Sequence, residues 1–399
     1  MKAIFKTFES GAGDCIFIIL KDETDGSSHH IMVDCNVLTS DIKCFIREEL
    51  KLRIDTLIVT HIDADHVNGV TKIMQTPEFA VLQIGQILFN GFQPQTDNVK
   101  TLDIEIKKKL DIVAESLPPV VNEDNHKTSG IDAACLITEI NKHPEWKAVW
   151  RKEPLLAGES ITLGNDAKWG YLKFLSPTQT ALDELLKKVK LEYAGKLGLA
   201  PPDGDFQDQD KYFEVLLRLS NLRKRPNPKK KIGSIIINKN LMERYAKIDV
   251  NENNVTPENK ASLAFYWEAT HSTKRILMMG DAVSSQVLSQ LNEIHQEEIW
   301  FEVIKVSHHG SKNNTSVDLC AKVDSIHFFI TGGKEQEGPH IETIAKIATK
   351  SLQEEKSHRV LHYNHTHSLW SELKNGNVKN ILNEYNLKTI TDNTHEFEY

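Results

Sequence analysis

One segment near the N-terminus constrains this chain more than any other part of its sequence. It reads Thr60-His61-Ile62-Asp63-Ala64-Asp65-His66-Val67-Asn68-Gly69 and follows the β-forming apolar run 56–60. Alternate residues of an extended chain point the same way, so His61 and Asp63 can hold one metal ion. Asp65 and His66 come after the chain turns and can hold a second ion. The segment therefore predicts a metal centre between a buried strand and a helix.

The ligand types in this segment limit which metals it can bind. Histidine imidazoles suit zinc and other transition ions, whereas carboxylates shift the preference toward harder ions such as manganese. We therefore expect one or two divalent ions, zinc or manganese, as cofactors. The alternative interpretation is a loop rich in His and Asp that makes only ordinary caps and salt bridges.

The composition places the chain among globular proteins. Its 399 residues are 40% hydrophobic and 26% charged, which is enough to bury a sizeable core. The net charge of −8 excludes a globally basic protein that coats nucleic acid, but not a local basic groove. The five cysteines include no CxxC pair, and the longest strongly apolar run, 15–20, is far too short to span a bilayer. We expect a cytoplasmic protein without a membrane segment.

The hydrophobic pattern alternates between strands and helices and predicts a layered α/β domain. Strands are expected at 2–8, 15–20, 30–34, 56–60, 160–163, 171–175, 262–267, 275–279, 301–306, 325–330 and 359–363. Helices are expected at 41–52, between Gly69 and Pro77, and at 183–197. Ser40 or Asp41 is the expected cap of the first of these helices.

The metal-binding segment also resembles a known family. HxDxDH after an apolar strand is similar to the HxHxDH motif of the metallo-β-lactamase fold, and Asp63 at the second position resembles the soluble domain of ComEC-type DNA-uptake proteins. Further segments resemble that domain in the same order along the chain. They are Gly13-Asp14-Cys15-Ile16-Phe17, Ile31-Met32-Val33-Asp34-Cys35, 158–163 with 174–177, Asn259-Lys260-Ala261-Ser262-Leu263, Leu277-Met278-Met279-Gly280-Asp281 and Val306-Ser307-His308-His309-Gly310-Ser311.

The resemblance implies a fold and a domain organisation. It covers about 1–90, 155–178 and 256–345, and it implies a four-layer αββα sandwich. The whole chain, 1–399, would then form a single metallo-β-lactamase-like domain. Insertions at about 91–155 and 179–255 would account for its length.

The same resemblance implies roles for individual residues in a site with two ions. His61 and Asp63 would hold the first ion, Asp65 and His66 the second, Asp281 would bridge them, and His309 would complete the second site. Asp65, Asp281 and His309 are the expected catalytic residues. His308 is expected to be either an alternate ligand or a phosphate contact.

The chain departs from the family pattern at the first ion. Most members supply a further histidine just before the strand that leads to the bridging Asp, but Pro257-Glu258-Asn259-Lys260 contains none. The first ion would then be weakly held, recruited with substrate, or absent. Asn259 could contribute an amide oxygen or position a water molecule.

Other acidic and histidine residues have two interpretations each. Asp14 and Asp34 could accept the second ring N–H of a ligand histidine, or could be ordinary turn and strand-end residues. His340 could contact substrate or metal, or could stand at a helix N-terminus. The late group His362, His365 and His367 is interpreted as surface or packing residues, since the family pattern does not include them.

Two bridged ions generate hydroxide at neutral pH, which predicts hydrolysis, and the Asp-rich ligand set favours a phosphodiester. We expect a nuclease or phosphodiesterase acting on nucleic acid, DNA rather than RNA, in DNA processing or as a defence effector with a regulatory protein partner.

A basic loop could grip the phosphate backbone, or could be merely solvated. It contains Arg223, Lys224, Arg225, Lys229, Lys230 and Lys231. The alternatives are hydrolysis of a small phosphoester or nucleotide, and a partner-regulated metal-binding module without catalysis.

Overall fold

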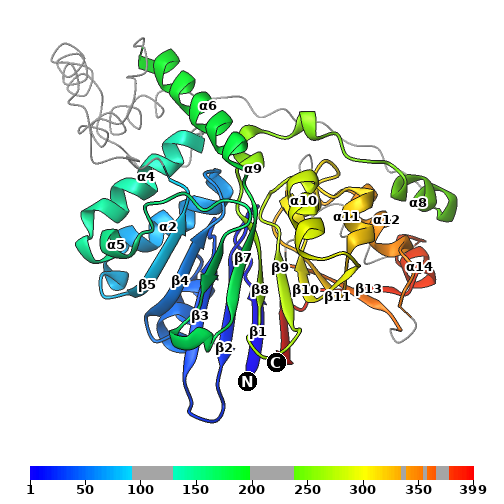
Figure 1. Ribbon diagram of the computed structural model, residues 1–399, viewed down its shortest axis with the longest axis horizontal. Helices are drawn as coiled ribbons and strands as arrows, with labels where there is room; N and C mark the ends of the chain where they lie inside the picture. Colours follow the sequence, from blue (N-terminus) through cyan, green and yellow to red (C-terminus); the bar gives the residue numbers. More distant parts are fainter. Residues whose placement is uncertain (92–128, 198–237, 334–337, 354–356, 365–376) are drawn as a thin grey trace.

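Two β-sheets pack face to face between two layers of helices (Figure 1). The computed structural model describes residues 1–91, 129–197, 238–333, 338–353, 357–364 and 377–399. The predicted αββα sandwich is confirmed. Within the described part of the chain, every helix is too short or too polar to cross a bilayer. The predicted insertions stay a prediction.

The first sheet joins the two ends of the chain. Its strand order is β14-β1-β2-β3-β4-β5. The bounds are β1 (Lys2–Thr7), β2 (Ile16–Lys21), β3 (Ser28–Val33), β4 (Arg53–Val59), β5 (Gln83–Phe89) and β14 (Thr394–Glu398). Lys2 of β1 pairs with Glu398 of β14, so the N- and C-termini lie side by side (Figure 1). Strands β3, β4 and β5 are parallel, and α2 (Ala64–Gln75) connects β4 to β5 as a crossover helix.

The second sheet is larger, and its neighbouring strands from β9 to β13 are parallel. Its order is β13-β12-β11-β10-β9-β8-β7-β6. The bounds are β6 (Ser160–Thr162), β7 (Tyr171–Ser176), β8 (Ala264–Glu268), β9 (Arg275–Met278), β10 (Ile299–Lys305), β11 (Val323–Ile330), β12 (Arg359–Tyr363) and β13 (Leu387–Ile390). Helices α10 (Ser284–Ile294), α11 (Val317–Lys322), α12 (Ile341–Thr349) and α14 (Asn377–Glu384) connect the parallel strands and lie on the outer side of this sheet (Figure 1).

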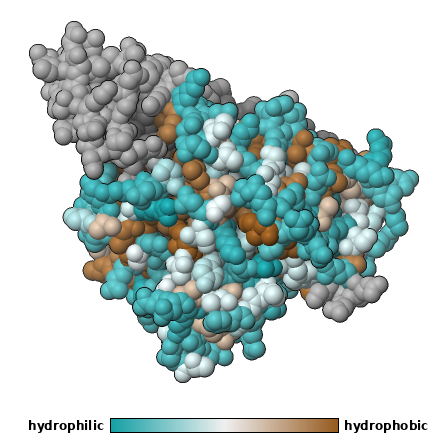
Figure 2. Space-filling view, viewed as in Figure 1, coloured by the Kyte–Doolittle hydropathy of each residue, from teal (hydrophilic) through white to brown (hydrophobic). Residues whose placement is uncertain are grey.

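Apolar side chains fill three layers of core. Phe5, Phe265 and Trp267 are fully buried where the two sheets meet. The outer face of the first sheet packs against α2, α4 (Ser129–Lys142) and α5 (Pro144–Val149), and α6 (Gln179–Leu197) follows β7. Hydrophilic residues cover most of the face in Figure 2, with hydrophobic residues in separate areas between them. The apolar side chains therefore hold the layers together rather than coat the surface.

All of the predicted strands are present, with ends that differ by three residues at most. The predicted helix cap was wrong: α1 (Ser40–Cys44) is capped by Thr39, whose Oγ1 accepts from the backbone N–H of Ile42. A π-helix, η1 (Phe45–Glu49), continues α1 where one helix had been predicted. The helix predicted after Gly69 begins at Ala64 instead, because the backbone is extended only as far as Asp63. Asp65 and His66 therefore lie on the first turn of α2.

Candidate metal centre

The candidate site lies where β4, β9 and β10 end. The turn after β4 carries the predicted metal-binding segment, the turn after β9 carries Asp281, and the turn after β10 carries His308 and His309. A backbone hydrogen bond from Leu263 N–H to the Thr60 carbonyl (2.8 Å) ties the turn after β4 to the start of β8. Another, from His308 N–H to the Gly280 carbonyl (3.0 Å), ties the turn after β10 to the turn after β9. Segments more than 200 residues apart in sequence thus share one site.

The ligand atoms of the predicted residues converge on one carboxylate oxygen. Asp281 Oδ2 lies 3.7 Å from His61 Nε2, 3.6 Å from His66 Nε2 and 4.0 Å from His309 Nε2. His61, His66 and Asp281 form one group whose ligand atoms lie within 4.8 Å of one another, and Asp65, His66 and His309 form a second. The two groups share His66, so the site has room for neighbouring ions.

In each of the three histidines, Nδ1 makes a hydrogen bond to another protein group, and Nε2 faces Asp281. The Nδ1 contacts are His61 to Thr60 Oγ1 (3.0 Å), His66 to Asp34 Oδ2 (2.7 Å) and His309 to the Thr331 carbonyl (2.7 Å). The Nε2 atoms of all three are buried and have no hydrogen-bond partner among the described residues. Buried polar atoms are normally paired, so these three converging lone pairs fit a metal ion.

Asp34 makes the contact expected of a carboxylate that orients a ligand histidine. Its Oδ2 accepts from Thr60 Oγ1 (2.7 Å) as well as from His66, and its Oδ1 accepts from the Thr60 backbone N–H (2.7 Å). Since Thr60 Oγ1 donates to Asp34, it accepts from His61 Nδ1. One buried carboxylate therefore fixes the tautomers of His61 and His66.

Sequence reasoning missed Lys305, which is fully buried beside the site. Its Nζ lies 2.5 Å from Asp14 Oδ2, 3.1 Å from the Gly280 carbonyl and 3.8 Å from Asp281 Oδ1. Burial alone would lower the pKa of Lys305, but Asp14 and Asp281 raise it above its ordinary value, so the ammonium stays charged. The sequence feature that could have indicated this role is the position of Lys305, a charged residue at the end of the apolar strand β10.

Asp14 contacts protein groups on the buried side of the site. Besides Lys305, it accepts a hydrogen bond from Thr331 Oγ1 and lies 3.4 Å from His309 Nδ1. Asp14, Asp34 and His66 also form a compact group. In that group, His66 Nδ1 is already paired with Asp34, and the carboxylate of Asp14 is already paired with Lys305. We therefore assign no ion to this group.

Without an ion, protons balance the charge of the site. Burial alone would lower the pKa of His309, but the carboxylates of Asp281 and Asp14 raise it to about 10. Burial alone would raise the pKa of Asp281, but His308, His66 and His309 hold it well below its ordinary value. A divalent ion would replace these protons, so metal binding is expected to release protons.

The other predicted residues lie at different distances from this centre. Asp63 Oδ2 is 3.6 Å from His61 Nε2, and Asp65 Oδ2 is 3.7 Å from His309 Nε2, both on the partly exposed side. His308 Nε2 is 3.6 Å from Asp281 Oδ2. His340 stands at the N-cap of α12, with its Nδ1 3.4 Å from the Lys312 backbone N–H and outside the two ligand groups.

Some predictions fall outside what the structure describes. The six basic residues of the predicted loop lie in 198–237, outside the described residues. His365 and His367 lie in 365–376, which is also outside the described residues. Asn259, on α9 (Pro257–Lys260), is described and buried, and its amide nitrogen contacts the ring of His308.

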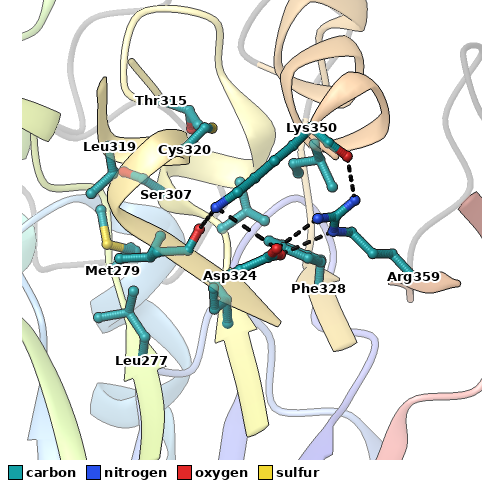
Figure 3. Close-up of a pocket in the computed structure, with 14 residues that line it drawn as sticks. Leu277, Met279, Ser307, Thr315, Leu319, Cys320, Asp324, Phe328, Lys350 and Arg359 are labelled. Atoms are coloured by element: carbon teal, nitrogen blue, oxygen red, sulfur yellow. Dashed lines mark hydrogen bonds and ion pairs between the residues drawn. The ribbon is translucent and has the colours of Figure 1, made fainter. Parts of the chain in front are cut away.

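An apolar cavity that none of the ligand residues lines lies between β9–β11 and helices α11 and α12 (Figure 3). Its volume is about 30 Å³, which is room for one or two water molecules. Asp324 at its edge is paired with Arg359, whose Nη2 lies 2.6 Å from Asp324 Oδ2. Because its size is small and these charges are satisfied, we assign no substrate to it.

Comparison with known proteins points to one family. Residues 11–144 match the model of the Metallo-beta-lactamase superfamily. The matched stretch contains Asp14, Asp34 and the whole segment 60–69, while Asp281 and His309 lie beyond it. No curated protein matches the chain. The narrower resemblance to ComEC-type proteins stays a prediction.

Proposed function

We propose that this chain, a hydrolase with a metallo-β-lactamase superfamily domain, is a metal-dependent phosphodiesterase that acts on nucleic acid. The observation that carries the proposal is the set of three buried Nε2 atoms that face Asp281 Oδ2 without hydrogen-bond partners among the described residues. When bound, divalent ions lower the pKa of a water molecule and neutralise charge on phosphoryl oxygens. No protein nucleophile is then required.

Different residues of the chain would bind the ions, balance their charge and face the substrate. His61, His66 and His309 would hold the ions through Nε2, and Asp281 would bridge them through Oδ2. Lys305 would offset the negative charge that three buried aspartates bring together. Asp65 is partly exposed, with 17% of its side chain accessible, so it would act as a ligand on the side from which a substrate arrives.

Two further features support a nucleic-acid substrate. The aspartates Asp65 and Asp281 among the proposed ligands suit ions that also bind phosphoryl oxygens. The basic segment 223–231 could contact a phosphate backbone, which dominates the affinity of nucleic-acid binding. We further propose that DNA is preferred to RNA, that the protein works in the cytoplasm, and that a regulatory protein partner acts on it.

The test is hydrolysis with manganese, zinc or magnesium added in turn. The substrates are plasmid, single-stranded DNA, RNA and bis(p-nitrophenyl) phosphate, and the variants are Asp65→Ala, Asp281→Ala and a deletion of 223–231. We expect either substitution to lower the rate on the order of 10³-fold, since each removes charge stabilisation worth several kcal/mol. The loop deletion should weaken DNA binding without slowing hydrolysis of the small diester.

Asp318→Ala is the matched control, because Asp318 is exposed on α11. Cleavage that survives both Asp65→Ala and Asp281→Ala would sink the assignment of the site. Hydrolysis of the small diester alone would indicate a small-phosphoester hydrolase. Metal binding without hydrolysis of any diester would indicate a metal-binding module.

A further inference from the structure

We infer that His308 is a ligand of the first metal ion and takes the place of the histidine that residues 257–260 lack. The inference rests on the metal centre of the proposed function. His308 Nε2 lies 3.6 Å from Asp281 Oδ2, and His61 Nε2 lies 3.7 Å from the same oxygen. A fourth imidazole thus faces the shared carboxylate at the distance of His61 and His66, although His308 itself stands outside the two compact ligand groups.

Asn259 does not take the ligand position itself. Its amide nitrogen lies 3.2 Å from His308 Nδ1 and 3.3 Å from His308 Nε2. Because Nδ1 faces Asn314 Oδ1, Nε2 is the ring nitrogen that accepts from Asn259 while no ion is bound. Asn259 Oδ1 is buried and has no hydrogen-bond partner among the described residues. The side chain at this position therefore supports the ring of His308.

The tautomer of His308 follows from a second asparagine. Asn314 Nδ2 donates to the Asp281 backbone carbonyl (2.9 Å), which turns Asn314 Oδ1 toward His308 Nδ1 at 3.0 Å. Asn314 Oδ1 can only accept, so His308 Nδ1 carries the proton and Nε2 keeps its lone pair. A lone pair suits a metal ligand, whereas a phosphate contact would need an N–H at that position.

The backbone of the turn is strained in a way that aims both histidines at Asp281. His308 has φ 46° and His309 has φ 51°, two consecutive left-handed residues without a glycine. Such residues cost on the order of 1 kcal/mol each and persist where the surroundings hold them. The turn is held by His308 N–H to the Gly280 carbonyl and by Ser311 N–H to the His308 carbonyl (2.8 Å). His309 approaches from the buried side, and His308, 21% exposed, approaches from the solvent side.

The test is the number and affinity of bound ions, measured on the full chain by titration calorimetry and elemental analysis with zinc or manganese. We expect two ions per wild-type chain. His308→Ala should weaken one of them by at least about 10-fold and leave the other unchanged. His308→Gln should behave in the same way, and adding Asn259→His to His308→Ala should restore the lost ion, because it returns an imidazole to the family position. His340→Ala is the control and should keep both ions.

Circular dichroism on each variant separates loss of metal from loss of fold. His308→Ala and His308→Gln variants that are folded and bind both ions with wild-type affinity would overturn the inference and leave the proposed function standing. A wild-type chain that loses one ion on His308→Ala, yet hydrolyses no diester, would uphold the inference and overturn the proposed function.

Discussion

Asp34 shows how a single side chain can decide the chemistry of its neighbours. It is fully buried, adopts a positive φ of 56°, and accepts from Thr60 and His66. Its negative charge favours the tautomer of His66 in which Nε2 is free to bind an ion. If His66 binds an ion as proposed, Asp34 would set the affinity of that ligand without touching the metal.

Replacement of Asp34 by Asn should lower metal affinity about 10–100-fold, because the amide removes the charge and sets an N–H donor against the donors of Thr60 or His66. Calorimetric titration with zinc measures this directly. Asp41→Asn, an exposed residue of α1, should leave the affinity unchanged. An Asp34→Asn variant that binds zinc as tightly as the wild type would show that Asp34 does not orient His66.

Site residues could be predicted from the sequence where several of them lie close together in one short motif. His61, His66 and Asp65 belong to one short segment, so their spacing was enough to indicate metal binding. Lys305 and Thr331 could not be predicted in the same way, because they meet Asp14 only after segments about 300 residues apart fold together. The roles of all these residues as ligands or supports stay predictions until an ion is located.

Three histidines link strands β11 and β12 of the second sheet to β14 of the first sheet. His327 Nδ1 on β11 donates to His362 Nε2 on β12 (2.9 Å), because His362 Nδ1 donates to the Asp392 carbonyl. The ring of His327 stacks on His395 of β14 with centroids 3.6 Å apart. His362 is buried and stacks on Phe329. Its interpretation as a packing residue agrees with this contact. Burial lowers the pKa of His327 to about 3 and that of His362 to about 4.

These histidines should make the fold less stable in acid. A histidine with a lowered pKa is neutral when folded, whereas in the unfolded chain it binds a proton below pH 6.5. Its stabilising contribution is therefore complete above pH 6.5 and is lost as the pH falls toward 4. His362→Gln should flatten the pH dependence of the free energy of unfolding by up to about 1.4 kcal/mol per pH unit in this window.

Urea unfolding of wild type and variant at pH 7, 6, 5 and 4 measures this slope. His271→Gln, at an exposed histidine, should keep the wild-type slope. Equal slopes for wild type and His362→Gln would mean that His362 is protonated as readily in the folded state as in the unfolded state.

In the molecule as a whole, alternating hydrophobic patterns predicted a layered α/β domain and most strands, whereas the αββα order of the layers came from the family resemblance. Three strands were missed. β13 (Leu387–Ile390) has only four residues and lies at the edge of its sheet. β5 (Gln83–Phe89) has exposed polar residues in its first half, and β14 (Thr394–Glu398) is mostly polar and is fixed by pairing with β1 at the far end of the chain. Pairing between distant segments leaves no local pattern, so the sequence could not show it.

We propose that the Nε2 atoms of His61, His66 and His309 surround divalent ions bridged by Asp281. Anomalous diffraction from crystals of the full chain grown with zinc or manganese locates such ions directly. We predict peaks about 2.0–2.3 Å from these nitrogen atoms and from Asp281 Oδ2. Peaks only at other sites, or none at saturating metal with the three Nε2 atoms hydrogen-bonded to protein or water, would contradict it.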